Sequence, residues 1–139
     1  MNPTSERHWS LPTACRVQYD ENVPCVEMVW QGYFTSEAFR AANANVLDVL
    51  RRTKCPNLLG DVTDFTLIGA ADQAWLNDEW IPQAIEAGVR NCALVQPTYF
   101  FNRVAVENVA QRVSDPRMVV NYFPDRATAR AFLRGLRTT

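Results

Sequence analysis

The side chains best suited to chemistry lie at the end of the predicted strand at residues 57–62 and directly after it. They are Asp61, Thr63, Asp64, Thr66 and Asp72. Paired carboxylates could bind a divalent cation or transfer protons, provided that they converge on one point. Aspartate and threonine after a strand are also standard turn and capping residues, and this explanation is the more common one. The segment is therefore a candidate ligand or partner surface without a defined reaction.

Aromatic side chains form a second candidate surface. Residues 96–101 (QPTYFF) contain Tyr99 and Phe100, and Trp75 and Trp80 lie in a predicted helical region before them. Five residues turn an ideal α-helix by about 140°, so the two tryptophans should not face the same core stripe. Most of these aromatics are expected to fill the core, but we expect one of the tryptophans to face a partner.

Arginines form the sharpest charge pattern in the chain. Arg126, Arg130, Arg134 and Arg137 are spaced 4, 4 and 3 residues apart, which places them on one face of a predicted last helix. Such a row could bind an acidic partner or a phosphate. A solvated surface opposite an apolar helix face is the more usual explanation, and we expect it here.

Other reactive residue types are isolated. The four cysteines lie 10, 30 and 37 residues apart, which fits no metal-binding knuckle, and we interpret them as buried thiols. The only histidine, His8, lies in a polar N-terminal segment, so no metal site is expected. The chain also lacks a serine nucleophile elbow, a phosphate-binding loop and a dinucleotide motif. We expect no cofactor and no enzymatic activity.

The composition indicates one ordinary soluble domain. The chain has 139 residues, of which 47% are hydrophobic, and 14 basic against 15 acidic groups give a net charge of -1. This balance argues against a nucleic-acid partner, because such binding depends on clustered cations. The apolar runs are much shorter than the roughly 20 residues of a membrane span, and the N-terminus lacks the apolar stretch of a signal peptide. We expect a cytoplasmic protein without a membrane span.

Hydrophobic periodicity predicts one domain over residues 13–139, after a lead-in at residues 1–12 that is either disordered or packed through Trp9. Pro82 should kink or break the second helix, and Gly88 should end it. The predicted strands are 14–20, 24–31, 57–62, 89–95 and 117–123, and the predicted helices are 36–53, 71–88, 98–113 and a last one after Asp125.

The order ββαβαβαβα predicts an α/β fold. We expect a five-stranded mixed sheet with an N-terminal antiparallel hairpin and helices packed on the sheet. Ligands of open α/β sheets bind outside the carboxyl ends of the parallel strands. The segments to inspect are therefore 61–72, 96–101 and 122–126.

This order, with LLGDVTD at 58–64, resembles the STAS-like (SpoIIAA-like) domain family, whose wider relatives include the CRAL-TRIO lipid-transfer domains. The motifs DQAWL at 72–76, WIP at 80–82, AGVR at 87–90 and ALV at 93–95 look like an uncharacterised bacterial branch of that family. The resemblance covers residues 14–136. Antagonist STAS domains carry a phosphorylatable serine after the third strand, where this chain has LIGAA at 67–71. The acceptor hydroxyl is therefore missing, and although Thr66 lies nearby as a displaced candidate, we expect no phosphorylation switch of the usual kind.

The leading hypothesis is a non-enzymatic STAS-like regulatory or protein-interaction domain that forms a homodimer. Its partner surface would lie near residues 63–80 and 96–101. The alternative is a carrier or sensor of a lipid or another small apolar ligand, and a third hypothesis is a small enzyme that uses Asp61 or Asp64. The candidate surface residues are Asp61, Thr63, Asp64, Thr66, Trp75, Trp80, Tyr99 and Phe100.

Overall fold

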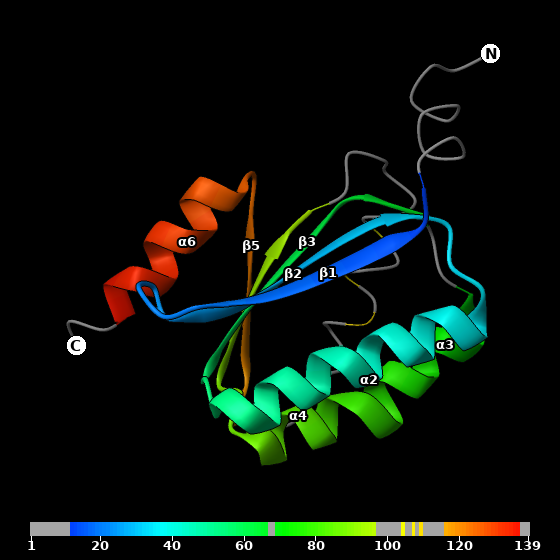
Figure 1. The fold of residues 1–139 in the computed structure, drawn as a ribbon, viewed down its shortest axis with the longest axis horizontal. Helices are drawn as coiled ribbons and strands as arrows, with labels where there is room; N and C mark the ends of the chain where they lie inside the picture. Colours follow the sequence, from blue (N-terminus) through cyan, green and yellow to red (C-terminus); the bar gives the residue numbers. More distant parts are fainter. Residues whose placement is uncertain are drawn as a thin grey trace.

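The fold is built on a five-stranded sheet with the strand order β1-β2-β3-β4-β5 (Figure 1). A computed structural model describes residues 12–66, 69–96, 104, 107, 109 and 116–136. Strand β1 pairs antiparallel with β2, and β2 to β5 run parallel to one another. The predicted α/β class and the N-terminal hairpin are confirmed. The strands are β1 (Ala14–Asp20), β2 (Cys25–Gly32), β3 (Asn57–Phe65), β4 (Asn91–Val95) and β5 (Val119–Phe123).

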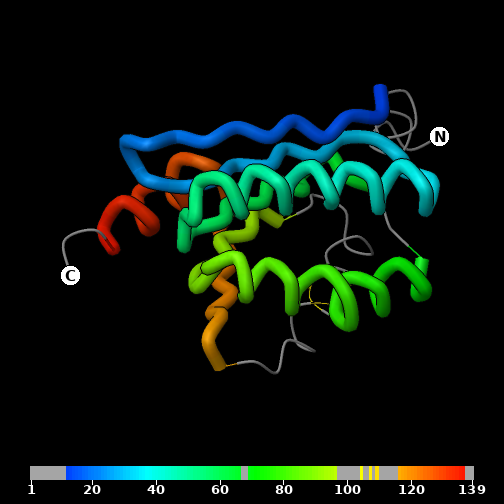
Figure 2. The backbone as a smooth tube through the Cα atoms, turned by 60° about the horizontal axis from the view of Figure 1, so that its bottom comes forward, coloured from blue at the N-terminus to red at the C-terminus, as the bar shows by residue number. Residues whose placement is uncertain are grey.

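The described helices cover the two faces of the sheet unequally. On one face lie α2 (Ser36–Thr53), α3 (Ala70–Trp75) and α4 (Ile81–Ala87), and α3 and α4 are joined by a π-helical turn, η1 (Leu76–Trp80). On the other face lies α6 (Arg126–Gly135). Crossovers between parallel strands are right-handed, so helices that connect successive neighbours fall on the same face. Figure 2 shows α2 and the α3–α4 segment running side by side in the same direction.

Two apolar cores result from this arrangement. The larger core lies between the sheet and α2, α3 and α4, and the smaller one lies between the sheet and α6. Successive strand residues point to opposite faces, so Leu58 belongs to the larger core and Leu59 to the smaller one. Gly60 again faces the larger core, where an added Cβ would lie 2.9 Å from side-chain atoms of Met28 and Leu94. Both faces of β3 are covered, which explains why its sequence is a nearly continuous apolar run.

Local capping residues fix the ends of the helices. The Thr35 side chain accepts a hydrogen bond from the backbone N–H of Ala38 at the start of α2, and Asp125 accepts one from Thr128 at the start of α6. Gly88 ends α4 with a left-handed backbone (φ 118°), which a side chain would disfavour. The boundaries predicted from these residues are confirmed.

Strand β3 is longer than predicted, and this changes the position of two candidate residues. The pairing of β2 with β3 continues beyond a bulge between Val29 and Gln31, and it ends at Gly32 and Phe65. Thr63 and Asp64 therefore lie in the strand and not in the loop after it.

The predicted helix at 98–113 lies outside the described residues except at 104, 107 and 109, which are helical. Residues 1–11 of the predicted lead-in also lie outside the described residues.

The break that Pro82 predicts is present, but as a π-helical turn. The backbone N–H of Ile81 donates to the carbonyl of Leu76, five residues earlier, and Pro82 lies at the start of α4. The wider turn shifts the helical phase, so Trp75 and Trp80 both contact α2. The inference that they must point in different directions was wrong, because it assumed ideal α-helical geometry.

None of the helices in the described part of the chain is long and apolar enough to cross a membrane.

Candidate functional site

Asp61 lies where the carboxyl end of the sheet was predicted to place it, beside Val95 at the end of β4. Its Oδ1 accepts hydrogen bonds from the backbone N–H (3.0 Å) and the hydroxyl (2.6 Å) of Thr63. Its Oδ2 pairs with Nε of Arg126 at 3.2 Å. Both carboxylate oxygens are thus engaged within the chain. This arrangement orders α6 against β3 and argues against a role for Asp61 as a proton acceptor.

Asp64 and Thr66 lie at the end of β3 next to β2. Asp64 is in register with Gln31, and the backbone N–H of Thr66 donates to the carbonyl of Gly32 at 3.0 Å. The Thr66 hydroxyl oxygen is buried and has no hydrogen-bond partner among the described residues. A kinase could reach this hydroxyl only after local opening, so the geometry does not favour Thr66 as a displaced phosphorylation site.

Asp72 joins the starts of α2 and α3. It is 6% exposed, accepts a hydrogen bond from the Ser36 hydroxyl at 2.7 Å, and pairs with Nε of Arg40 at 3.4 Å. The Arg40 guanidinium also lies 5.2 Å from the centre of the Trp75 ring. These contacts fix α2 and α3 to each other. They also engage both carboxylate oxygens of Asp72, which was a candidate for ligand binding in the sequence.

The aromatic part of the candidate surface is only partly described. Trp80 is 6% exposed, and its indole N–H donates to the carbonyl of Asn43 at 2.7 Å. Trp75 packs edge-on against Phe39, with a distance of 6.1 Å between ring centres. Tyr99 and Phe100 lie outside the described residues. Trp80 therefore belongs to the core and offers no surface to a partner.

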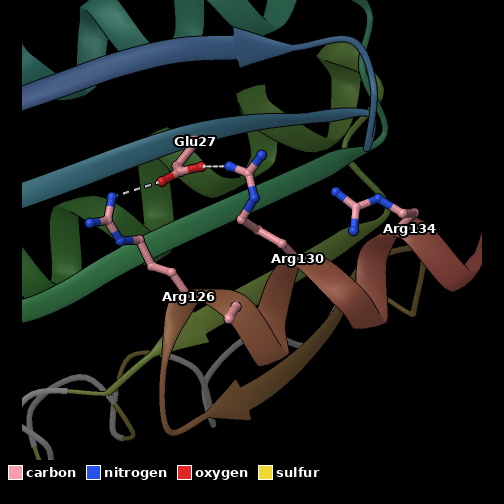
Figure 3. A pocket seen from close by; sticks show the side chains of 5 residues that line it. Glu27, Arg126, Arg130 and Arg134 are labelled. Carbon is pink, nitrogen blue, oxygen red and sulfur yellow. Dashed lines mark hydrogen bonds and ion pairs between the residues drawn. The ribbon is translucent and has the colours of Figure 1, made fainter.

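A charged cluster that the sequence did not reveal lies under α6. Glu27 is in the middle of β2, and its side chain is 3% exposed. It accepts hydrogen bonds from Arg126 at 3.1 Å and from Arg130 at 2.5 Å, and Figure 3 shows it between these two guanidinium groups. The cluster could have been suspected from a single acidic residue in an otherwise apolar part of β2 and from the spacing of the arginines.

The same arginines reach two further carboxylates. Arg126 pairs with Asp61 on β3, and Arg130 pairs with Asp20 on β1. The pKa of Asp20 is lowered by the backbone N–H of Asn22 and by Arg130. A lowered pKa favours folding above the ordinary pKa of the carboxyl, and this contribution is lost as the pH falls through the lowered value.

The ion pairs overturn one expectation from the sequence. Arg126 and Arg130 were expected on a solvated helix surface, but they face the acidic residues of three neighbouring strands. The apolar residues Ala129 and Leu133 pack against the sheet beside them. Arg137 lies outside the described residues.

A pocket opens beside this cluster, with a volume of about 420 Å³. Its lining is mostly cationic. The side chain of Arg126 is 50% exposed and that of Arg130 is 27% exposed, so water reaches both guanidinium groups. The lining residues are Glu27, Arg126, Ala127, Arg130 and Arg134.

The described residues hold no group of three or more histidine, cysteine, aspartate or glutamate side chains that could bind a metal ion. The four cysteines are free thiols, and burial raises the pKa of Cys15 and Cys92 to about 12. Burial, followed by the charge of Glu27, raises the pKa of Cys25 to about 12 as well.

We expect these thiols to react slowly in the native protein, because the thiolate is the reactive form. A chromogenic disulfide reagent at mildly alkaline pH should detect few thiols before denaturant is added and four afterwards. Cys15 is the one partly exposed cysteine, so a Cys15→Ser variant should remove any slow native reaction. Rapid native labelling of that variant would contradict the prediction.

Together, the fold and the cluster define an open α/β protein whose second sheet face is closed by a helix held through ion pairs. Comparison of the chain with protein-family models, curated proteins and solved structures gives no match. The resemblance to the STAS-like family stays a prediction from the sequence motifs.

Proposed function

We propose that this chain is a non-enzymatic regulatory or protein-interaction domain of the STAS-like type that works as a homodimer. The observation that carries the proposal is the apolar character of the sheet edge at β5. Val119 is 52% exposed and Tyr122 is 37% exposed, although both belong to this strand. Phe132 of α6 is also 37% exposed and packs on Phe123, with 5.1 Å between ring centres. Val119 and Phe123 lie on the α6 side of β5, and Tyr122 lies on the other side. We call these four residues the β5 edge surface.

The two edges of the sheet differ in how they discourage pairing with another chain. In the part of the chain that the structure describes, β1 and β5 are the outermost strands. Strand β1 carries the charged residues Arg16 and Asp20, whereas β5 (VVNYF) has neither a charge nor a proline. Charges and prolines are the usual means by which proteins block pairing at a sheet edge. Strand β5 is therefore the edge better suited to pairing.

A second copy of this chain is the partner that fits best. An identical strand placed antiparallel to β5 would extend the sheet across a two-fold axis, so each copy would use the same residues. The added strand would lie beside the exposed side chains on both sides of β5.

The candidate acid–base residues support a role without catalysis. Asp61 and Asp72 are bound to neighbouring side chains, as described above. The pocket under α6 has a charged lining, so it does not support the carriage of a lipid or another apolar ligand. The four free thiols fit a reducing compartment, and we place this role in the cytoplasm.

The assembly is tested by replacing Val119 with lysine. The wild-type protein should have twice the chain mass of 15.8 kDa in light scattering after size-exclusion chromatography. Val119→Lys should raise the dimer dissociation constant about 100-fold, because it would place a charge on each of the two paired edge strands. The side chain is half exposed, so the variant should keep its circular dichroism spectrum and melting temperature.

Tyr19→Lys is the matched control, since Tyr19 is 45% exposed on the opposite edge strand. This variant should remain a dimer. A monomeric wild-type protein at micromolar concentration would refute the homodimer, and dissociation by Tyr19→Lys but not by Val119→Lys would refute the β5 edge.

A further inference from the structure

The pocket beside α6 has the composition of an anion-binding site. We propose that it binds a small molecule carrying a phosphate or carboxylate group, held by Arg130 and Arg134 at the surface of the cluster. Its volume of about 420 Å³ is in the usual range for small-ligand sites, roughly 300 to 1,000 Å³. This inference does not depend on the dimer proposed above.

More arginine than glutamate side chains line the pocket, and the arginines are the more accessible to a ligand. Three arginines and one glutamate line it, and Asp20 and Asp61, which pair with Arg130 and Arg126, are not among the lining residues. The carboxylate of Glu27 is 3% exposed, and each of its oxygens accepts a hydrogen bond from a guanidinium group. A ligand that enters the pocket therefore meets guanidinium N–H groups and not the carboxylate.

Arg134 differs from the two arginines before it. Arg126 pairs with Glu27 and Asp61, and Arg130 pairs with Glu27 and Asp20. Arg134 is exposed, and its charge attracts the carboxylate of Asp20 without a direct ion pair among the described residues. It follows Arg130 by four residues on α6, a spacing that makes side chains neighbours on a helix surface. Figure 3 shows Arg134 next along the helix from Arg130.

Guanidinium chemistry indicates the class of ligand. The planar guanidinium group presents its N–H donors in a fork that matches two oxygens of a carboxylate or phosphate. The exposed guanidinium group of Arg134 supplies such donors. An apolar or cationic ligand would not gain this interaction.

Binding at this site should also stabilise the fold. The pocket is formed by arginines of α6 together with Glu27 of β2, so it exists only when α6 packs on the sheet, and the anion should bind the folded chain and not the unfolded one. The ligand would then tighten the attachment of α6, which gives the protein a means of sensing the anion.

The test is thermal unfolding in inorganic phosphate or succinate, each compared with sodium chloride at the same ionic strength. We expect a saturable rise in Tm of about 5 °C in at least one of the two anions. Arg134→Gln should weaken binding at least about tenfold in calorimetric titration. A response to phosphate alone identifies phosphate compounds as the ligand class, and a response to succinate alone identifies carboxylates.

Arg52→Gln is the matched control, because Arg52 is an exposed arginine on α2, which lies on the opposite face of the sheet. This variant should bind the anion as the wild-type protein does. The proposal is overturned if neither anion raises Tm more than sodium chloride does, or if Arg134→Gln and Arg52→Gln respond alike.

Discussion

Replacement of Trp80 by alanine is expected to lower the free energy of unfolding by about 3 to 5 kcal/mol. Trp80 is 6% exposed in the larger core, so the substitution leaves a cavity where the indole ring packs. It also removes the hydrogen bond of 2.7 Å to the carbonyl of Asn43, which is then left without this donor. Urea denaturation followed by circular dichroism measures the change.

Trp80→Phe separates the two contributions. It keeps an aromatic ring but loses the indole N–H, so it should cost less than the alanine variant, about 1 to 2 kcal/mol. Both variants should keep the oligomeric state of the wild-type protein under conditions where they are folded. If Trp80→Ala kept its stability but lost its self-association, Trp80 would be an interface residue and the prediction would be wrong.

Glu27→Gln should be the second large effect, a loss of about 3 kcal/mol in the free energy of unfolding. The substitution preserves the shape of the side chain but removes the charge that faces Arg126 and Arg130. Removal of one partner from a buried ion pair costs more than the pair itself contributes. Arg126 and Arg130 keep Asp61 and Asp20 as partners. Water reaches the two arginines in part, and this keeps the expected loss at the lower end of the range.

A double-mutant cycle with Arg130→Gln tests whether the charge pair causes the loss. The double variant should be less destabilised than the sum of the two single variants, because the attraction between Glu27 and Arg130 is lost in each single variant and only once in the double variant. Additive losses would show that Glu27 and Arg130 act independently. Arg52→Gln serves again as a control, since its guanidinium lies on an exposed helix surface.

Much of the fold could be predicted because its signals are local. Thr35, Gly88 and Asp125 mark helix ends by their own hydrogen bonds or backbone angles, which depend on a few neighbouring residues. The alternation in the hairpin is equally local. The extension of β3 to Phe65 could not be predicted in this way, because it depends on a bulge in the partner strand β2.

The candidate site was harder to predict because its contacts join distant parts of the chain. The position of Asp61 followed from its place in a strand, but its partner Arg126 comes from the last helix. Glu27 lies under two arginines of the last helix, a contact that no local pattern in β2 indicates. Trp75 and Trp80 were misjudged since a π-helical turn changes the direction of side chains without a clear sequence signal.

The order of strands in the sheet is the order of their synthesis, and this suggests how the nascent chain folds. Each parallel strand can pair with the one made just before it, so no strand must wait for a distant partner. Helix α6 is made after all five strands, and until then Leu59, Ala93 and Val95 have no cover from it. Glu27 also stays hydrated during that time. The last stage of folding should therefore be the docking of α6, in which burial of an apolar surface and pairing of charges occur together.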